Sequence, residues 1–165
     1  MVLENSSSFL DRLFGKINEL GVDISKFDLD HIAYQASSDE NYDSIKPTLL
    51  KIAELVDENI VGGRRVGLFK LDKPLIYRHY SVPALELVAP KEGQICPSAL
   101  EHVEFVIDES FDSFMKKYPN LNWDISAVNQ PIFPMIKLEI DRHVRVKFHY
   151  EPVLEIVRRK KREVI

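Results

Sequence analysis

Two stretches of this chain share one pattern: an acidic residue, then a histidine, then side chains that alternate between apolar and polar. The first stretch is Asp30–Gln35 and the second is Glu101–Val106. Such alternation is typical of a β-strand that packs one face on a core and shows the other face to solvent. His31 and His102 fall on the polar faces, so the fold must accommodate two similar strands that each present a histidine.

Composition sets the class of protein. The chain has 165 residues and a net charge of -4, which predicts a globular protein with a full core, either one domain or two small fused modules. Its apolar stretches are shorter than the roughly 20 residues that cross a bilayer, and the start at Met1 lacks the features of a signal peptide. We therefore expect a cytoplasmic protein, a monomer or dimer with no membrane partner. The single cysteine, Cys96, excludes an intrachain disulfide and a cysteine-cluster zinc site.

The charge distribution bears on nucleic acids as partners. Nucleic-acid binding depends on clustered positive charge, and this chain is mildly acidic, so we expect no nucleic-acid partner. One basic run, Arg158–Arg162, follows apolar residues at helical spacing. We interpret it as the solvated end of a last helix, where cations complement the helix dipole; the alternative is a nucleic-acid or targeting role.

The order of elements predicts an α+β protein with a duplicated module. An amphipathic helix over Phe9–Leu20 comes first. Each module then consists of a strand, a helix and three further strands, and a short match, Tyr42–Ile45 against Phe111–Phe114, supports the duplication. We place the N-terminal helix in residues 1–27, the first βαβββ module in 28–92, the second in 98–151 and a C-terminal basic helix in 152–165, all in one domain.

Specific strands are expected in both modules. Gly62-Gly63 predicts the turn of a hairpin, and Pro83 predicts a bulge or bend that breaks the long strand that follows. The expected strands of the first module are Asp30–Ala36, Glu58–Val61, Arg64–Leu71, and Ile76–Ser81 continued by Ala84–Val88. The expected elements of the second module are the strand Glu101–Ile107, the helix Ser110–Tyr118, and extended segments near Trp123–Val128, Met135–Ile140 and Val144–Tyr150.

Four candidate metal ligands fall on the polar faces of these strands: His31, Glu86, His102 and His149. A sheet covered on one side also shows polar residues to solvent, which is the alternative for each strand taken alone. Two or three histidines with a carboxylate suit a divalent first-row metal such as Zn, Ni, Mn or Fe(II). His79 and His143 are expected to be ordinary surface residues.

Other polar residues are candidates for chemistry or for substrate binding. Glu104 shares a face with His102 and could be a further ligand, an acceptor that orients an imidazole, or a proton carrier. Asp30 and Glu101 are expected to point away from their histidines and to cap or pair locally rather than bind metal. The candidate substrate-binding residues, whose alternative role is solubility, are Gln35, Arg64, Lys70, Arg78 and Lys147.

These motifs, taken together and in this order, resemble the YecM family, which is itself similar to the vicinal oxygen chelate superfamily of glyoxalases, extradiol dioxygenases and bleomycin-resistance proteins. The resemblance covers the chain from about Phe9 to Val157. The residues that carry it are Asp30–Ile32, Glu58–Ile60, Gly63-Arg64, Leu68–Leu71, Leu85–Leu87, Glu101–Glu104 and Val146–His149.

The resemblance implies paired modules that form a half-open barrel around a cavity holding a divalent metal. Carried over by position, His31, Glu86 and His102 would be ligands. The fourth position departs from the superfamily pattern, because Lys147 and His149 stand where a glutamate is usual. The resemblance therefore argues against a glyoxalase-type isomerase that moves protons with that glutamate, and leaves His149 as fourth ligand or acid/base.

Three functions are consistent with the sequence. The first is a metal-dependent enzyme, an isomerase, lyase or oxygenase, that acts on a small molecule with neighbouring oxygens, with His149 or Glu104 moving the proton. The second is a protein that binds or sequesters a small molecule without turnover, as bleomycin-resistance proteins do. The third is a domain with an inert cavity that binds another protein.

Overall fold

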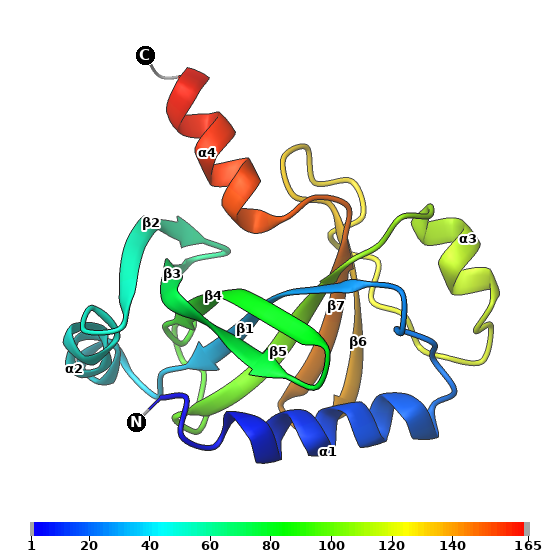
Figure 1. Ribbon diagram of the computed structural model, residues 1–165, viewed down its shortest axis with the longest axis horizontal. Coiled ribbons are helices and arrows are strands. Elements are labelled where there is room, and N and C mark those ends of the chain that lie inside the picture. Colours follow the sequence, from blue (N-terminus) through cyan, green and yellow to red (C-terminus); the bar gives the residue numbers. More distant parts are fainter. Residues whose placement is uncertain (1, 164–165) are drawn as a thin grey trace.

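In the computed structural model, which describes residues 2–163, helices flank a single mixed sheet (Figure 1). The elements are α1 (Ser6–Glu19), β1 (Asp28–Gln35), α2 (Asp39–Leu49), β2 (Ala53–Val61), β3 (Arg64–Tyr77), β4 (Tyr80–Val88), β5 (Ala99–Val106), α3 (Phe111–Lys116), β6 (Met135–Asp141), β7 (Val144–His149) and α4 (Val153–Glu163).

The sheet joins two modules of similar connectivity. Over the described residues it has seven strands in the order β2-β3-β4-β1-β5-β7-β6. In each module the first strand pairs in parallel with the last, β1 with β4 and β5 with β7, and the two first strands pair antiparallel with each other. This arrangement confirms the predicted α+β fold of paired modules in a half-open barrel with an added N-terminal helix.

The second module is less complete than the sequence predicted. The expected strand near Trp123–Val128 is irregular, and a single bridge between Asp124 and Lys137 remains of it. Ser126 N–H donates to the Asp124 carboxylate instead of extending a ladder. The matched aromatic residues also differ in position, because Tyr42 is the fourth residue of α2 and Phe111 the first of α3. The duplication is therefore carried by strand pairing more than by that short match.

One turn lies where the sequence predicted it, and another does not. Gly62 and Gly63 have φ values of 58° and 79°, as a tight two-residue hairpin turn between β2 and β3 requires. β4 continues through Pro83, so the expected break in the strand is wrong, but the expected irregularity is present, because the β3–β4 register shifts between the pairs Lys70–Ala84 and Leu75–Val82. The chain turns earlier, at Arg78, with a φ of 55°. A non-glycine residue in that region gives no local signal for a turn.

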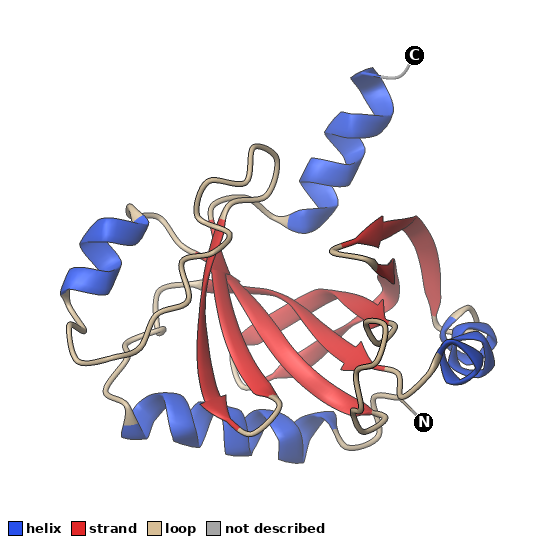
Figure 2. Cartoon of the chain, turned by 180° about the vertical axis from the view of Figure 1, so that it is seen from behind, coloured by secondary structure: helices blue, strands red, loops and turns tan. Residues whose placement is uncertain are grey.

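The main core lies between the sheet and α1, which runs along one face (Figures 1 and 2). Apolar residues at three- and four-residue spacing on α1 are buried there, and the Phe14 ring packs on the rings of Tyr77, Tyr80 and Phe105. The opposite face of the sheet is therefore free to hold polar side chains.

Helix α4 covers part of that opposite face with its first turns and then projects away from the sheet (Figure 1). Val153 and Val157 form a small apolar cluster with Leu68 and Ala84. The predicted basic helix is present, although its expected residues 164–165 lie outside the described part of the chain. No helix among residues 2–163 is long and apolar enough to cross a bilayer.

Candidate metal centre

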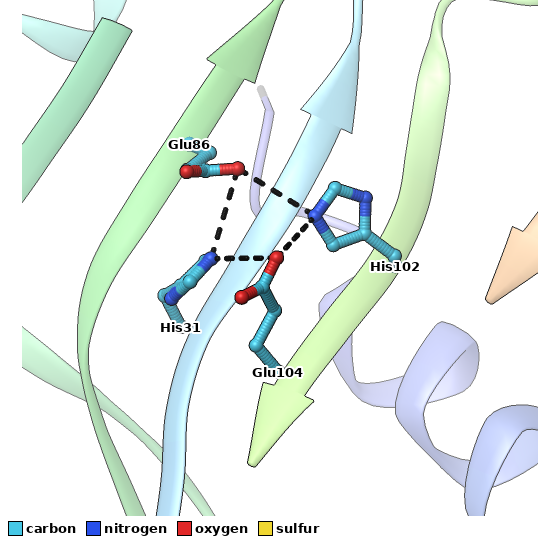
Figure 3. Close-up of side chains that lie close together, drawn as sticks. All are labelled: His31, Glu86, His102 and Glu104. Carbon is cyan, nitrogen blue, oxygen red and sulfur yellow. Dashed lines mark ion pairs between the residues drawn. The ribbon is translucent and has the colours of Figure 1, made fainter. Parts of the chain in front are cut away.

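Four side chains from three adjacent strands meet on the face opposite α1 (Figure 3). His31 comes from β1, Glu86 from β4, and His102 and Glu104 from β5. Strand pairing explains the convergence: His31 is paired with Glu104, and Ala33 is paired with Glu86 on one side and His102 on the other. The small Ala33 side chain leaves room between them.

The donor atoms of these residues have the spacing of a metal-binding group. His31 Nε2 is 3.7 Å from Glu86 Oε2 and 3.4 Å from Glu104 Oε1. His102 Nε2 is 3.5 Å and 3.2 Å from the same two oxygens. Ligands at 2.0–2.2 Å around a tetrahedral ion would be roughly 3.3–3.6 Å apart. The four atoms therefore need little movement to share one ion.

The other nitrogen of each imidazole is held by the acidic residue that precedes it. His31 Nδ1 is 2.9 Å from Asp30 Oδ2, and His102 Nδ1 is 2.7 Å from Glu101 Oε2. A carboxylate accepts hydrogen bonds, so each Nδ1 carries a proton and donates it. This directs Nε2 of both histidines to the centre, as in metal sites whose ligands are oriented by carboxylates.

Two β-bulges place these acidic residues where strict alternation would not. Leu29 and His31 pair with the consecutive residues Phe105 and Glu104, so Asp30 is an extra residue in β1. Glu101 is an extra residue in β5 in the same way, between Leu100 and His102. A bulge re-aims a side chain. The expectation that Asp30 and Glu101 point away from the histidine face is therefore wrong, although the expected local pairing is present.

The alternation predicted that the centre would be open to solvent, and this expectation is wrong because the centre is buried. His31, His102 and Glu104 are at most 1% exposed. Within the described residues, the buried atoms His31 Nε2, Glu104 Oε2 and His149 Nε2 have no hydrogen-bond partner. An unsatisfied buried polar atom costs about 1–3 kcal/mol. A bound cation at His31 Nε2 would remove that cost, and two imidazoles with two carboxylates suit Zn, Ni, Mn or Fe(II).

Electrostatics favour positive charge at the centre. Burial opposes ionisation of Glu86 and Glu104, but the charges of His31 and, for Glu104, Lys147 outweigh it, so the pKa of each carboxyl lies well below its usual value. Burial also lowers the pKa of His31, but the carboxylates of Glu104 and Glu86 raise it well above its ordinary value. The carboxylates thus attract either a proton or a metal ion to His31 Nε2.

Lys147, predicted to bind substrate, lies among the candidate ligands instead of beyond them. Its Nζ is 2.8 Å from His102 Nε2 and 2.8 Å from Glu104 Oε1. The side chain is 11% exposed. The ammonium group is therefore in contact with two of the four donor atoms.

His149, predicted as fourth ligand and acid/base, lies beside the centre. Its Nδ1 is 2.8 Å from the carbonyl oxygen of Glu151, and its Nε2 is 3.3 Å from Asp30 Oδ2 and 3.4 Å from Glu104 Oε2. It forms a second compact group with Asp30 and His31, whereas the four-residue group does not include it. Glu104 takes the fourth place in the geometry, and the acid/base role of His149 stays a prediction.

The remaining predicted substrate-binding residues are not gathered at the centre. Arg64 Nη1 donates to Gln35 Oε1 at 3.1 Å, and Gln35 Nε2 donates to two carbonyl oxygens. Lys70 is exposed on β3. Arg78 lies in the turn after β3, 3.6 Å from Asp11 and over the Phe14 ring. As expected, His79 and His143 are exposed.

A cavity of about 130 Å³ lies next to the orienting residue Glu101, and Gln35 and Arg145 also line it. None of the four convergent side chains is part of its lining. Arg145 Nη1 is 3.5 Å from Glu101 Oε1. This cavity therefore touches Glu101, which orients His102, and not the centre itself.

Comparisons with known proteins identify relatives of the chain. The family model described as YecM protein matches residues 1–159. An uncharacterized protein of Haemophilus influenzae is 30% identical over 122 residues, which are 74% of this chain and 61% of the relative. Protein YecM of Escherichia coli is 28% identical over 109 residues, or 64% of this chain and 58% of the relative. The matched part of the chain thus spans less than two thirds of either relative.

Solved structures share the fold. One described as Protein EC4020 has a TM-score of 0.79 at 22% identity, with 96% of this chain and 91% of that chain covered. The hypothetical protein BH1468 from Bacillus halodurans has a TM-score of 0.54 at 14% identity, with 77% and 96% covered. The family match runs from the first residue through most of α4 and includes every residue of the centre, so the resemblance expected from the sequence motifs is confirmed and this chain belongs to the YecM family.

Proposed function

We propose that this protein binds a divalent first-row metal ion through His31, Glu86, His102 and Glu104 and acts as an enzyme on a small, oxygen-rich molecule. One observation carries the proposal: two imidazoles, each fixed through Nδ1 by a carboxylate, direct Nε2 at two further carboxylates in a buried place. Four convergent donors with this second layer of hydrogen bonds are typical of metal sites.

Each residue of the centre would have a separate role in catalysis. A bound divalent ion would act as a Lewis acid and stabilise negative charge on two neighbouring substrate oxygens. Asp30 and Glu101 keep the imidazoles oriented, and burial keeps bulk water out. Glu104 directs Oε1 at the centre and Oε2 at His149 Nε2, 3.4 Å away. His149 would exchange a proton with Glu104 at that oxygen, which suits isomerase, lyase or oxygenase chemistry.

The metal content of the purified protein tests the metal centre. The protein would be prepared without chelators or a histidine tag and compared with His31→Ala, His102→Ala and the matched control His79→Ala, whose ring is exposed. Wild type and control should carry about one equivalent of metal, and the other two variants should carry little. Equal metal content in all four proteins, whether full or negligible, would refute the proposal.

The burial of the centre also favours the second candidate, a protein that sequesters a small molecule without converting it. Three of the four donor side chains are 0–1% exposed, and Glu86 is 15% exposed. Metal-loaded protein would be incubated with catechols and 2-hydroxy ketones, and both binding and product formation would be followed. Product formation that is lost in His31→Ala supports the enzyme, whereas tight binding with no product supports sequestration.

A further inference from the structure

Lys147 occupies a position that the pairing of the sheet makes equivalent to Glu86. In the first module Glu86 on β4 pairs in parallel with Ala33, two residues after His31. In the second module Lys147 on β7 pairs in parallel with Glu104, two residues after His102. One module therefore supplies an anion to the centre and the other supplies a cation from the corresponding place.

The contacts of Lys147 are those of a charged ammonium group. Glu104 Oε1 lies 2.8 Å from Nζ, the distance of a hydrogen bond from an ammonium group to a carboxylate oxygen. His102 donates through Nδ1 to Glu101, which leaves a lone pair on Nε2 facing Nζ at 2.8 Å. Lys147 thus donates to both atoms.

An imidazole Nε2 has one lone pair in the plane of its ring. That lone pair can accept a hydrogen bond from Lys147 or bind a metal ion, but it cannot do both at once. Glu104 Oε1 has further lone pairs and can accept from the ammonium group while it faces the centre, so the competition is for His102 Nε2. Metal loading therefore requires Lys147 to release His102.

We propose that Lys147 is a tethered cation that competes with the metal ion for His102 Nε2 and so lowers the affinity of the centre for divalent ions. This inference rests on the metal site proposed above. It makes the ammonium group a determinant of metal affinity. An ion must bind nitrogen strongly enough to displace it.

Replacing the ammonium group by an uncharged chain of similar length tests the competition. Lys147→Met should bind Zn²⁺ and Mn²⁺ at least about tenfold more tightly than wild type, because a hydrogen bond from a charged group no longer has to be broken. The two ions should gain by about the same factor, because the same hydrogen bond no longer has to be broken for either. Dissociation constants would be measured by competition with a chromophoric chelator.

Lys137→Met is the matched control. Lys137 lies directly across from Lys147 in the β6–β7 ladder, but its Nζ contacts Asp124 and Ser126 at 3.4 Å. The Lys137→Met substitution removes the same charge from a neighbouring strand and should change metal affinity less than twofold. Equal effects of the two substitutions would mean that net charge alone, and not competition, sets the affinity.

The outcomes separate this inference from the proposed metal site. If neither wild type nor Lys147→Met binds metal, the site itself fails. If both bind equally, or the variant binds more weakly, only the role of Lys147 is overturned.

A measurement on wild type covers the case in which the variant does not fold. A hydrogen-bonded lysine ammonium group exchanges its protons slowly enough to be seen by ¹H–¹⁵N NMR, and one equivalent of Zn²⁺ should shift or remove this signal. A Lys147 ammonium signal that Zn²⁺ leaves unchanged would overturn the inference.

Discussion

The acidic residues that precede His31 and His102 have the clearest single-residue role in this protein. Asp30 and Glu101 each occupy a β-bulge, and each carboxylate holds the Nδ1 of the next residue. A histidine that could rotate would lose part of its affinity for a metal ion to conformational entropy. The bulges therefore preorganise the donors before any ion is bound.

Replacing Glu101 by alanine should weaken metal binding by about 10- to 100-fold, the usual effect of removing a partner that orients a ligand. Chelator competition would measure the affinity, and ¹⁵N NMR would show whether Nδ1 of His102 loses its proton. Glu139→Ala is a suitable control, because Glu139 also contacts Arg145 but is exposed. Unchanged affinity in Glu101→Ala would contradict an orienting role.

Tyr77 gives a test of pH dependence away from the centre. Burial and its hydrogen bond to Asp11 raise the pKa of Tyr77 to about 12. Because the folded pKa is raised, the stability that Tyr77 contributes is fully present below about pH 10, the unfolded pKa, and is lost as pH rises through about 12.

Tyr77→Phe should therefore lower the free energy of unfolding by about 1 kcal/mol at pH 8, the usual worth of one hydrogen bond. The difference from wild type should shrink above pH 10. Urea unfolding at several pH values would measure it, and a difference that stays constant up to pH 11.5 would contradict the shifted pKa.

At the scale of elements, a hydrogen bond from a buried tyrosine holds α2 against the edge of the sheet. The Tyr42 hydroxyl donates to Glu58 on β2 at 2.9 Å, and Lys46 Nζ donates to the same carboxylate oxygen at 2.7 Å. Gly67 on β3 allows this, because a Cβ there would overlap Tyr42 Oη and lie 3.1 Å from the Phe69 ring. The glycine is needed for space and not for backbone conformation.

Gly67→Ala should destabilise the fold by about 1–3 kcal/mol through overpacking. Gly15→Ala in α1 is the matched control, because outside its chain neighbours and the helix's own backbone no atom of the described residues lies within 4 Å of the added Cβ. This substitution should stabilise the helix by about 0.5–1 kcal/mol. Thermal unfolding of both variants would compare them. Similar stabilities for the two would show that Tyr42 moves aside easily.

At the scale of the whole molecule, the candidate centre joins the two modules. Glu86 and His31 belong to the first module and His102 and Glu104 to the second, and β1 pairs with β5 between them. An ion held by all four would bind only the folded arrangement of both modules. Metal binding and global stability should therefore be linked.

Metal addition should raise the melting temperature of the metal-free protein. An ion at 100 times its dissociation constant adds about 2.7 kcal/mol, which corresponds to a rise of about 5–10 °C for a chain of this size. EDTA should reverse the rise, and His31→Ala should show little of it. An equal rise in wild type and His31→Ala would indicate that the ion binds elsewhere.

The sequence predicted much of this arrangement because alternation is a local property. His31, Glu86 and His102 could be placed on one face by counting along each strand, and strand pairing then brought them together. The departures have nonlocal causes. The bulges at Asp30 and Glu101 and the turn at Arg78 depend on neighbouring strands, and the burial of the centre depends on how the sheet curves and where α4 packs.

Asp30 is also the acceptor for the first turn of α4, since Val153 N–H lies 3.1 Å from Oδ2 and 3.3 Å from Oδ1. One carboxylate thus serves the helix terminus and the His31 imidazole together. If α4 left the sheet, the Asp30 carboxylate would no longer accept a hydrogen bond from Val153 and would accept more strongly from His31 Nδ1. The Nε2 atom of His31 would then be a stronger electron donor. Any partner that draws α4 away from the sheet would therefore change the basicity of His31 without touching it, and by reciprocity an ion at His31 would change how readily that partner binds.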